Sequence, residues 1–478
     1  MLALYAAFIQ DYETITRVQA GYATLIVMLG ALPSLVSMIS RREAGLLPLM
    51  QLHGLFYSII FGLPVFSSKI QWSQGSTNEV ADALIRPHQG LVNSSAITVA
   101  LVMTILGLIC LYIGYYASRG FYSRALRPIQ FLNKVPIERR IWIAWILYGI
   151  NMVFQLVPAL VSMPSVGQLF TPLGYLSTGI LFLLALDKVV SKKHFVLLTA
   201  AIVFSLTIKI LSGSLAQAVF FLVFLGILYW AKKRVLPWGF ILISCFIAIM
   251  LNPIKLNYRE YTRVVVDSPP QSYLYKARMF HKAAYEYFTD DDTIYSKGID
   301  NGVVYRVGHS FIVFTDVIAM TPEQVPFWLG ASYQTLWTSF IPRLLWPGKP
   351  QATIGNEFGH RYKQLEPKDK STSYNLAWLP EFYANFGASG VVLGMFSVGI
   401  LFRFLVQKLS VPISFSIEYV LGAAITFGLF YAESNFALMV GALLTPYLAL
   451  LALLRVLTLR YNIRTFINIQ SMRWHLKK

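Results

Sequence analysis

Long runs with almost no charged side chain recur along the whole chain, and they constrain its fold more than any other feature. Each run is long enough for a helix of about 20 residues to cross the ~30 Å hydrocarbon core of a bilayer. Hydrophobic residues make up 56% of the chain and charged residues 13%, whereas an ordinary soluble protein is about 25% charged. The sequence therefore predicts an all-α polytopic integral membrane protein. It excludes disordered, collagen-like, disulfide-rich secreted and cytosolic classes.

The apolar runs predict about 11 transmembrane helices and one large extracytoplasmic loop, which lies between the eighth and ninth spans. The turn Ser212-Gly213-Ser214 separates the short sixth and seventh spans and is typical of a helical hairpin. The predicted organisation is an N-terminal membrane bundle (1–253), the loop (254–389), and C-terminal membrane helices with a basic tail (390–478). The predicted spans are 20–39, 44–66, 94–117, 141–161, 167–186, 195–211, 215–230, 235–253, 390–407, 411–432 and 437–456.

Basic residues predict the orientation of these spans. The net charge is +18, and most of the Lys and Arg outside the large loop fall in segments on one side, such as 118–140 and 455–478. Cytoplasmic loops carry this excess of Lys and Arg. We therefore expect a multi-pass protein of the cytoplasmic (inner) membrane, with its N-terminus outside and its C-terminus inside. The same bias accounts for the high charge without a nucleic-acid partner.

The predicted spans contain few ionisable groups, which weighs against a pump or an ion-coupled transporter. Lys209 is expected to anchor a helix by snorkelling, Glu433 to be a charge at a helix end, and His53 to face the bundle as a polar group. Cys110 and Cys245 lie in apolar runs without metal or redox spacing. We therefore predict no metal site and no cofactor.

Polar chemistry is concentrated in the large loop, beginning with the stretch Arg306-Val-Gly-His309-Ser-Phe-Ile-Val-Phe-Thr-Asp316. If this stretch is helical, Arg306, His309 and Asp316 lie on one face. A guanidinium, an imidazole and a carboxylate together are suited to binding an anion and moving a proton. The plainer interpretation is an ion pair lining a groove between the loop and the membrane.

A proline-rich segment, 340–350, follows and displays Arg343, Trp346 and Lys349 on a stiff backbone. Rigid display reduces the entropy lost on binding. A guanidinium matches phosphate with a planar fork, whereas an ammonium acts as a point charge. Arg343 and Lys349 are therefore candidate phosphate ligands. An interfacial bend with its cations at the lipid headgroups is the alternative.

The end of the loop contains further candidates. Arg361 is a candidate substrate-binding residue, with a local ion pair to Glu357 as the alternative. The stretch 375–387 contains Trp378, Glu381, Tyr383 and Asn385 just before a span. Glu381 is either a partly hydrated catalytic carboxylate at the outer membrane surface or a charge in the first turn of a helix. Trp346 and Trp378 belong either to an aromatic belt or to a surface that stacks on sugars.

Three motifs in this region carry a family resemblance. The runs IPRLLWPGKP (341–350), GNEFGHRY (355–362) and NLAWLPEFYANFG (375–387) resemble the Wzy-type oligosaccharide-repeat-unit polymerases of O-antigen and exopolysaccharide synthesis. The recognisable part covers about 305–405. The Arg-x10-Gly repeat of some members is absent.

The resemblance implies a glycosyltransferase that uses no nucleotide sugar. Such enzymes transfer a growing glycan from polyprenyl pyrophosphate to a new lipid-linked repeat unit at the outer face of the membrane. The implied substrate is undecaprenyl-pyrophosphate-linked oligosaccharide. Membrane lipids, a Wzz-type chain-length regulator and a flippase are the implied partners.

Chemical demands assign roles within that reaction. Arg343, Lys349 and Arg306 are expected to stabilise the leaving pyrophosphate. Glu381 and His309 compete as the general base, and Glu381 is preferred because a carboxylate beside the outer headgroup layer can face a hydroxyl acceptor. Substrate binding is expected from Arg361, Trp346, Trp378, Tyr383 and Asn385. The alternatives are an O-antigen ligase-type transferase, a flippase or transporter of lipid-linked glycan, and a non-catalytic membrane scaffold.

Overall fold

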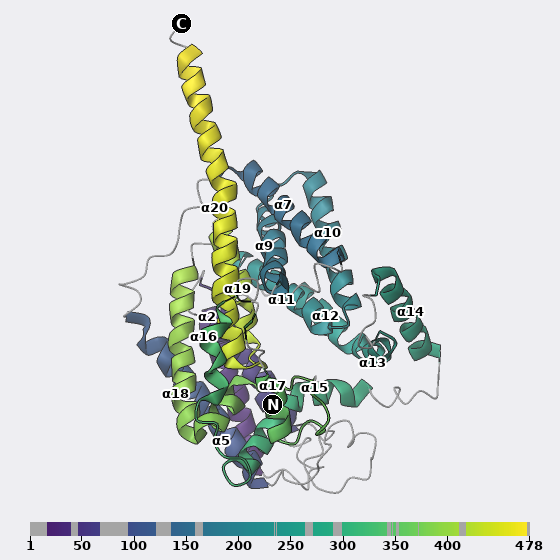
Figure 1. Cartoon of the computed structure of the whole chain (residues 1–478), viewed down its shortest axis with the longest axis vertical. Helices are drawn as coiled ribbons and strands as arrows, with labels where there is room; N and C mark the ends of the chain where they lie inside the picture. The colour runs from purple at the N-terminus through teal and green to yellow at the C-terminus, as the bar shows by residue number, and fades with distance from the viewer. Residues whose placement is uncertain are drawn as a thin grey trace.

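The computed structural model describes residues 17–39, 46–66, 94–120, 135–157, 166–233, 235, 237–262, 271–289, 299–341, 346, 348–349, 353–370, 372–410 and 417–475. Within these ranges the chain is helical and contains no β-strand. The fold is therefore all-α, as the sequence predicts. Figure 1 shows α20 (Phe436–His475) extending past the rest of the molecule, whereas α15 (Ile299–Met320) and α17 (Ile354–Arg361) lie toward the opposite end.

Seven of the described helical segments are long and apolar enough to cross a membrane, which fits a membrane protein. They coincide with predicted spans and lie at Arg17–Met38, Leu49–Phe66, Ser95–Ala117, Lys192–Leu211, Leu215–Lys233, Trp378–Leu409 and Phe436–Leu457. The first three of these segments are α2 (Arg17–Ile39), the run of α3 (Leu49–Tyr57), η2 (Ser58–Gly62) and η3 (Leu63–Phe66), and α5 (Ser94–Ala117). They continue with α10 (Lys192–Leu211), α11 (Leu215–Lys233), α18 (Trp378–Leu409) and α20.

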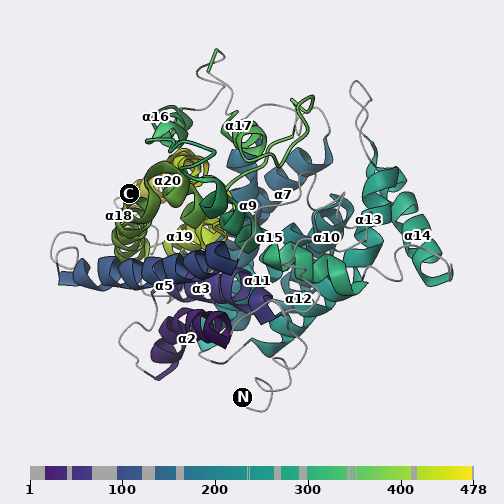
Figure 2. The same cartoon turned by 90° about the horizontal axis from the view of Figure 1, so that it is seen from below.

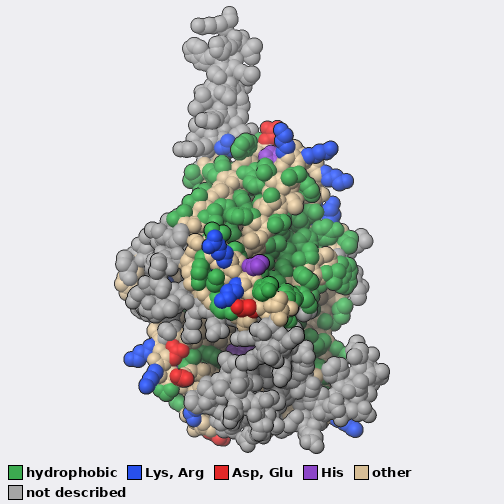
Figure 3. All heavy atoms as spheres, turned by 90° about the vertical axis from the view of Figure 1, so that its right-hand side faces the viewer, with side chains coloured by type: hydrophobic (Ala, Val, Ile, Leu, Met, Phe, Trp, Pro, Cys, Tyr) green, Lys and Arg blue, Asp and Glu red, His purple; other side chains and the backbone are tan. Residues whose placement is uncertain are grey.

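The other four predicted spans correspond to helices that do not meet the same criteria of length and hydropathy. Three contain shorter apolar segments: α9 (Val166–Leu186), α12 (Trp238–Met250), and α19 (Ile417–Thr426) with η5 (Phe427–Phe430). The fourth is α7 (Ile137–Leu156), whose first turn carries Glu138, Arg139 and Arg140. Figure 3, in which the right-hand side of Figure 1 faces the viewer, shows a broad hydrophobic face with Lys and Arg side chains along its upper edge.

Two local predictions about the membrane helices can be compared directly with the structure. Gly213 forms the expected turn between α10 and α11 with φ of 77°, a conformation that favours glycine. Helix α18 begins at Trp378, whereas its span was predicted to begin at residue 390. The helix is broken at Phe386 and at Gly387, which has φ of 62° and ψ of −144°. The predicted start at residue 390 therefore lies in the second segment of α18. The first segment falls in the part of the chain that was predicted to be the large loop.

Helices α5 and α18 pack closely through glycines on both sides of their interface. A Cβ atom on Gly114 would lie 2.1 Å from the carbonyl oxygen of Phe396, and one on Gly399 would lie 2.2 Å from that of Leu111. Only glycine permits this approach of two helix backbones, as is common at membrane helix interfaces. The second segment of α18, which follows the break at Gly387, is thereby fixed against α5.

The region between α12 and α18 is divided into two structural parts. A hairpin of α13 (Asn252–Tyr261) and α14 (Tyr273–Thr289) lies beside α10, and Figure 2 shows it at one edge of the molecule. Helix α15 packs against α5 and α18, followed by η4 (Ala331–Tyr333), α16 (Thr335–Ser339) and α17. The second part carries the candidate site.

Candidate functional site

Helix α15 confirms that the stretch beginning at Arg306 is helical, and its buried face is aromatic. Phe311 and Phe314 are fully buried and pack edge-on against Phe61 of the membrane bundle. These contacts hold α15 across the end of the bundle. Its polar face is therefore directed away from the bundle core. The Arg306 backbone belongs to α15, but its side chain lies outside the described residues.

Gln364 and Tyr374, which follow α17, contact the polar face of α15. His309 is exposed and lies edge-on to Tyr374, with ring centroids 5.3 Å apart. Asp316 accepts a hydrogen bond from Nε2 of Gln364 at 3.0 Å. Burial and the nearby Asp316 carboxylate both raise the pKa of the Tyr374 hydroxyl. The structure thus places His309 and Asp316 against the same segment.

The Arg361 guanidinium lies over the Trp328 ring, 4.5 Å from the ring centroid. This stacking replaces the local ion pair with Glu357 that was the alternative in the sequence. Beneath it, Phe358 and Tyr362 pack with α15 residues in a second, small hydrophobic cluster. Arg361 is therefore held on a rigid support beside α15.

The proline-rich segment is described only in part. Lys349 donates a hydrogen bond from Nζ to the carbonyl oxygen of Ile341 at 2.9 Å, and Trp346 is exposed. The predicted phosphate ligand Arg343 lies outside the described residues. This hydrogen bond connects Ile341 and Lys349, which are described residues near the start and the end of the segment.

Glu381 lies in the first turn of α18, which confirms one of its two sequence-based interpretations. It is not the partly hydrated carboxylate of the other interpretation, because it is 0% exposed. Its Oε1 accepts a hydrogen bond from the Ser332 hydroxyl at 2.7 Å, and its Oε2 accepts one from the backbone N–H of Phe436 at 2.7 Å. Phe436 is the first residue of α20, so the carboxylate caps that helix. Such a group stabilises a junction but is poorly placed to contact a substrate hydroxyl.

Asn385 joins the same network from the next turn of α18. Its Nδ2 donates to the Ser332 hydroxyl and to the Glu381 carbonyl, and its Oδ1 accepts from the Gly330 N–H. Asn385 is 1% exposed. It therefore fastens the 328–333 turn to α18 rather than offering its amide to a ligand.

The two aromatic candidates of the same stretch also face inward. Trp378 is 0% exposed and contacts the rings of His53, Phe402 and Phe436. Its faces are unavailable for stacking on a sugar in this structure. Tyr383 is partly buried and lies edge-on to Phe314 of α15. Both rings join α18 to neighbouring elements.

Glu433 is a candidate to which the sequence assigned only a charge at a helix end. It precedes α20 and is partly buried, and its Oε1 accepts a hydrogen bond from the Ser310 hydroxyl at 2.8 Å. Ser310 follows the exposed His309 on α15. The nearest sequence signal was a lone carboxylate at the end of an apolar run, which does not reveal the Ser310 partner because the two residues are far apart in the chain.

The start of α18 fixes the segment that carries Glu433. The backbone N–H of Trp378 donates to the carbonyl oxygen of Ala432 at 3.1 Å, while Glu381 holds the N–H of Phe436. Residues 432–436 are thus hydrogen-bonded at both ends to one helical turn. We refer to this arrangement as the α18–α20 junction.

Lys209 and His53, two ionisable residues of the predicted spans, have aromatic surroundings. Lys209 has its Nζ 5.3 Å from the Tyr175 ring centroid and 5.5 Å from that of Phe221. His53 is fully buried in the bundle, as expected. Among the described residues, no group of three His, Cys, Asp or Glu side chains is placed to hold a metal ion.

Over its described residues the chain is all-helical, with seven helices that fit a membrane protein and a polar site where α15 meets the α18–α20 junction. A family model described as a domain of unknown function (DUF8712) matches residues 97–465, and the chain belongs to that family. The matched region begins in α5, ends within α20 and includes every residue of this site. No curated protein and no solved structure matches the chain.

Proposed function

We propose that this protein polymerises polyprenyl-pyrophosphate-linked oligosaccharide repeat units at the outer face of the cytoplasmic membrane. The three sequence motifs that resemble Wzy-type polymerases support this proposal. The second and third motifs contribute side chains to the region around α15 and the α18–α20 junction. In the proposed topology the chain has 11 spans, with the N-terminus outside and the C-terminus inside.

The observation that carries the proposal is the contact between Ser310 and Glu433 beside the exposed His309. A carboxylate that is partly buried and oriented by a hydroxyl donor is a suitable general base. Glu433 therefore replaces Glu381 as the preferred carboxylate base, and His309 remains its competitor. Glu381 is instead a positioning residue, which fixes the segment that carries Glu433.

The proposed reaction is a single glycosyl transfer. The acceptor hydroxyl oxygen forms a bond with the anomeric carbon of the donor glycan, and the bond from that carbon to the pyrophosphate oxygen breaks. The hydroxyl proton passes to the base, and polyprenyl pyrophosphate leaves with the bonding electron pair. Cleavage of the activated lipid bond drives the transfer, so no nucleotide is consumed.

Cations are required where the pyrophosphate gathers charge. Arg361, held on Trp328, is a described guanidinium at the end of α17, whose Phe358 packs with α15 residues. Arg306 and Arg343 are assigned to the same role from the sequence, and Lys349 is assigned to it with them. A Wzz-type chain-length regulator and a flippase are the proposed partners.

Deletion of the gene followed by gel analysis of surface glycan tests the proposed function. Loss of the polymer ladder with retention of single-repeat products is the expected result. Lipid-linked polymer that accumulates without transfer would instead indicate a ligase. Repeat units confined to the cytoplasmic leaflet would indicate a flippase, and an unchanged ladder would contradict any role in this pathway.

A further inference from the structure

The α13–α14 hairpin is attached to the end of a membrane helix. The Tyr258 hydroxyl of α13 donates to the carbonyl oxygen of Leu211, the last residue of α10, at 2.5 Å. The Tyr273 hydroxyl of α14 donates to the carbonyl oxygen of Gln155 at 3.0 Å, near the end of α7. The hairpin is therefore fixed at the level where these two helices end.

The inner face of the hairpin forms a small hydrophobic core of its own. Ile254 and Tyr258 of α13 and Ala283 of α14 are buried together, with Phe280 packed edge-on against Tyr258. These contacts determine which face of α14 points outward. That outer face is then available to its surroundings.

The outer face of α14 combines apolar and basic side chains. Leu274, Tyr285 and Phe288 are 65%, 63% and 75% exposed, and Arg278 and His281 are exposed between them. These five residues are spaced so that they form one stripe along a helix. Single exposed apolar side chains are common on protein surfaces, whereas several gathered in one stripe mark a contact surface.

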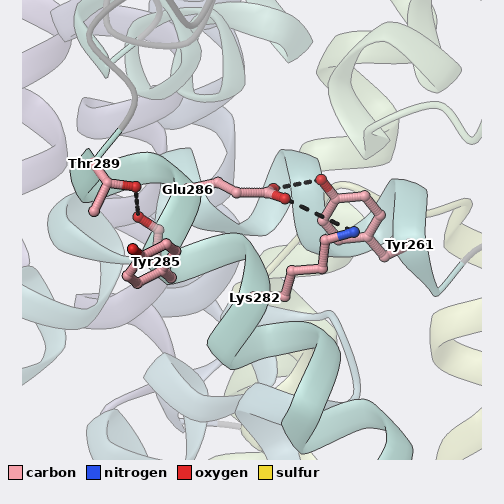
Figure 4. Close-up of polar contacts among 5 residues, drawn as sticks. All are labelled: Tyr261, Lys282, Tyr285, Glu286 and Thr289. Carbon is pink, nitrogen blue, oxygen red and sulfur yellow. Dashed lines mark hydrogen bonds and ion pairs between the residues drawn. The ribbon is translucent and has the colours of Figure 1, made fainter.

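The charge of α14 is strongly one-sided. Its sequence carries Lys276, Arg278 and Lys282 against a single acidic residue, Glu286. Figure 4 shows the Glu286 carboxylate directed toward the Tyr261 hydroxyl, which donates a hydrogen bond to it. Lys282 also pairs with Glu286, at 3.8 Å, but its side chain is 54% exposed. Among the described residues, no carboxylate is paired with Arg278, so the outer stripe presents positive charge there.

We propose that α14 lies in the headgroup layer of the bilayer and binds anionic phospholipid. Basic residues are attracted to phosphate headgroups, while Leu, Tyr and Phe enter the boundary between headgroups and acyl chains. Helix α10, which contacts α14, also exposes the apolar side chains of Val203 and Phe204. Charge complementarity and this neighbouring apolar helix identify a lipid surface as the occupant.

This site is separate from the α18–α20 junction and does not depend on the proposed polymerase activity. It gives the protein a preference for membranes that contain anionic phospholipid. Failure of the polymerase proposal would leave the lipid site intact. Conversely, failure of lipid binding would leave the glycosyl-transfer site untouched.

A quenching experiment on the full chain tests the proposal. Thr289→Cys, in a chain with Cys110→Ala and Cys245→Ala, is labelled with an environment-sensitive fluorophore and reconstituted in vesicles. The vesicles contain phosphatidylcholine alone or with phosphatidylglycerol, together with lipids that carry a nitroxide quencher near the headgroup. We expect quenching that increases with the fraction of phosphatidylglycerol.

Charge variants separate lipid recognition from folding. Native mass spectrometry is used to count phosphatidylglycerol molecules retained by wild type, by Arg278→Gln with Lys282→Gln, and by the matched control Lys368→Gln with Lys370→Gln. Each basic residue removed near a membrane surface is expected to weaken anionic lipid binding by about fivefold. The first variant should lose retention and the phosphatidylglycerol-dependent quenching, and the control should keep both. An unquenched label, or equal behaviour of the two variants, would overturn the proposal.

Discussion

The carboxylate of Glu381 accepts a hydrogen bond from the backbone N–H of Phe436 at 2.7 Å, so one side chain at the start of α18 caps the start of α20. This contact connects residues that are 55 positions apart in the sequence. The short segment 432–436, which carries Glu433, is hydrogen-bonded at both of its ends to the first turn of α18. The geometry of the candidate site therefore depends on a residue that does not itself reach the site surface.

Replacement of Glu381 by Gln should lower stability more than it lowers turnover. The amide retains one oxygen acceptor where the carboxylate offers two, and a lost charge-assisted hydrogen bond costs about 1.5–3 kcal/mol. We expect a lower thermal midpoint of the detergent-solubilised protein. Turnover per folded molecule should stay within about tenfold of wild type, which corresponds to a change of ~1.4 kcal/mol in activation free energy. Glu323→Gln, at an exposed turn, is the matched control. Full stability with abolished turnover would return Glu381 to the role of base.

Replacement of Glu433 by Gln should have the opposite effect. It preserves the shape and the contact with Ser310 but removes the basic oxygen, and loss of a general base typically costs 10²–10⁴-fold in rate. We expect a loss of roughly this size in polymer synthesis with an unchanged thermal midpoint. Ser310→Ala should produce a smaller loss, because the carboxylate remains but is less well oriented. Normal turnover of Glu433→Gln would assign the proton to His309.

The sequence predicts the all-helical membrane architecture because about 20 apolar residues in a row have few other stable structures. It also predicts the α10–α11 hairpin, since Ser212-Gly213-Ser214 interrupts two apolar runs. It does not reveal that Glu381 is buried, because its two donors, Ser332 and the Phe436 N–H, come from segments distant in the chain. Residue spacing along one helix carries no information about such contacts.

The break in α18 should be sensitive to substitution at Gly387. This residue has φ of 62° and ψ of −144°, a backbone region that is nearly restricted to glycine and costs other residues about 1–3 kcal/mol. A Cβ atom there would also lie 3.3 Å from the Phe327 ring. We expect Gly387→Ala to destabilise the protein in a thermal unfolding assay. Gly149→Ala, within α7 and without neighbours within 4 Å, should be neutral or slightly stabilising.

Arg343 is expected to bind pyrophosphate through the fork of its guanidinium. Arg343→Lys retains the charge but loses bidentate contact, and one charge-assisted hydrogen bond corresponds to a loss of roughly tenfold or more. Polymer synthesis in cells should fall accordingly while immunoblotting shows an unchanged protein level. Wild-type ladders from this variant would instead identify Arg343 as a headgroup anchor.

Purified protein in liposomes with defined polyprenyl-pyrophosphate-linked repeat units provides the most direct test of the proposed activity. The account predicts that wild type converts single repeats into a ladder of lipid-linked polymer without added nucleotide, that Glu381→Gln retains this activity per folded molecule, and that Glu433→Gln loses it. Wild-type protein that is folded, correctly inserted and supplied with the repeat unit of its own organism, yet forms no glycosidic bond, would contradict the account.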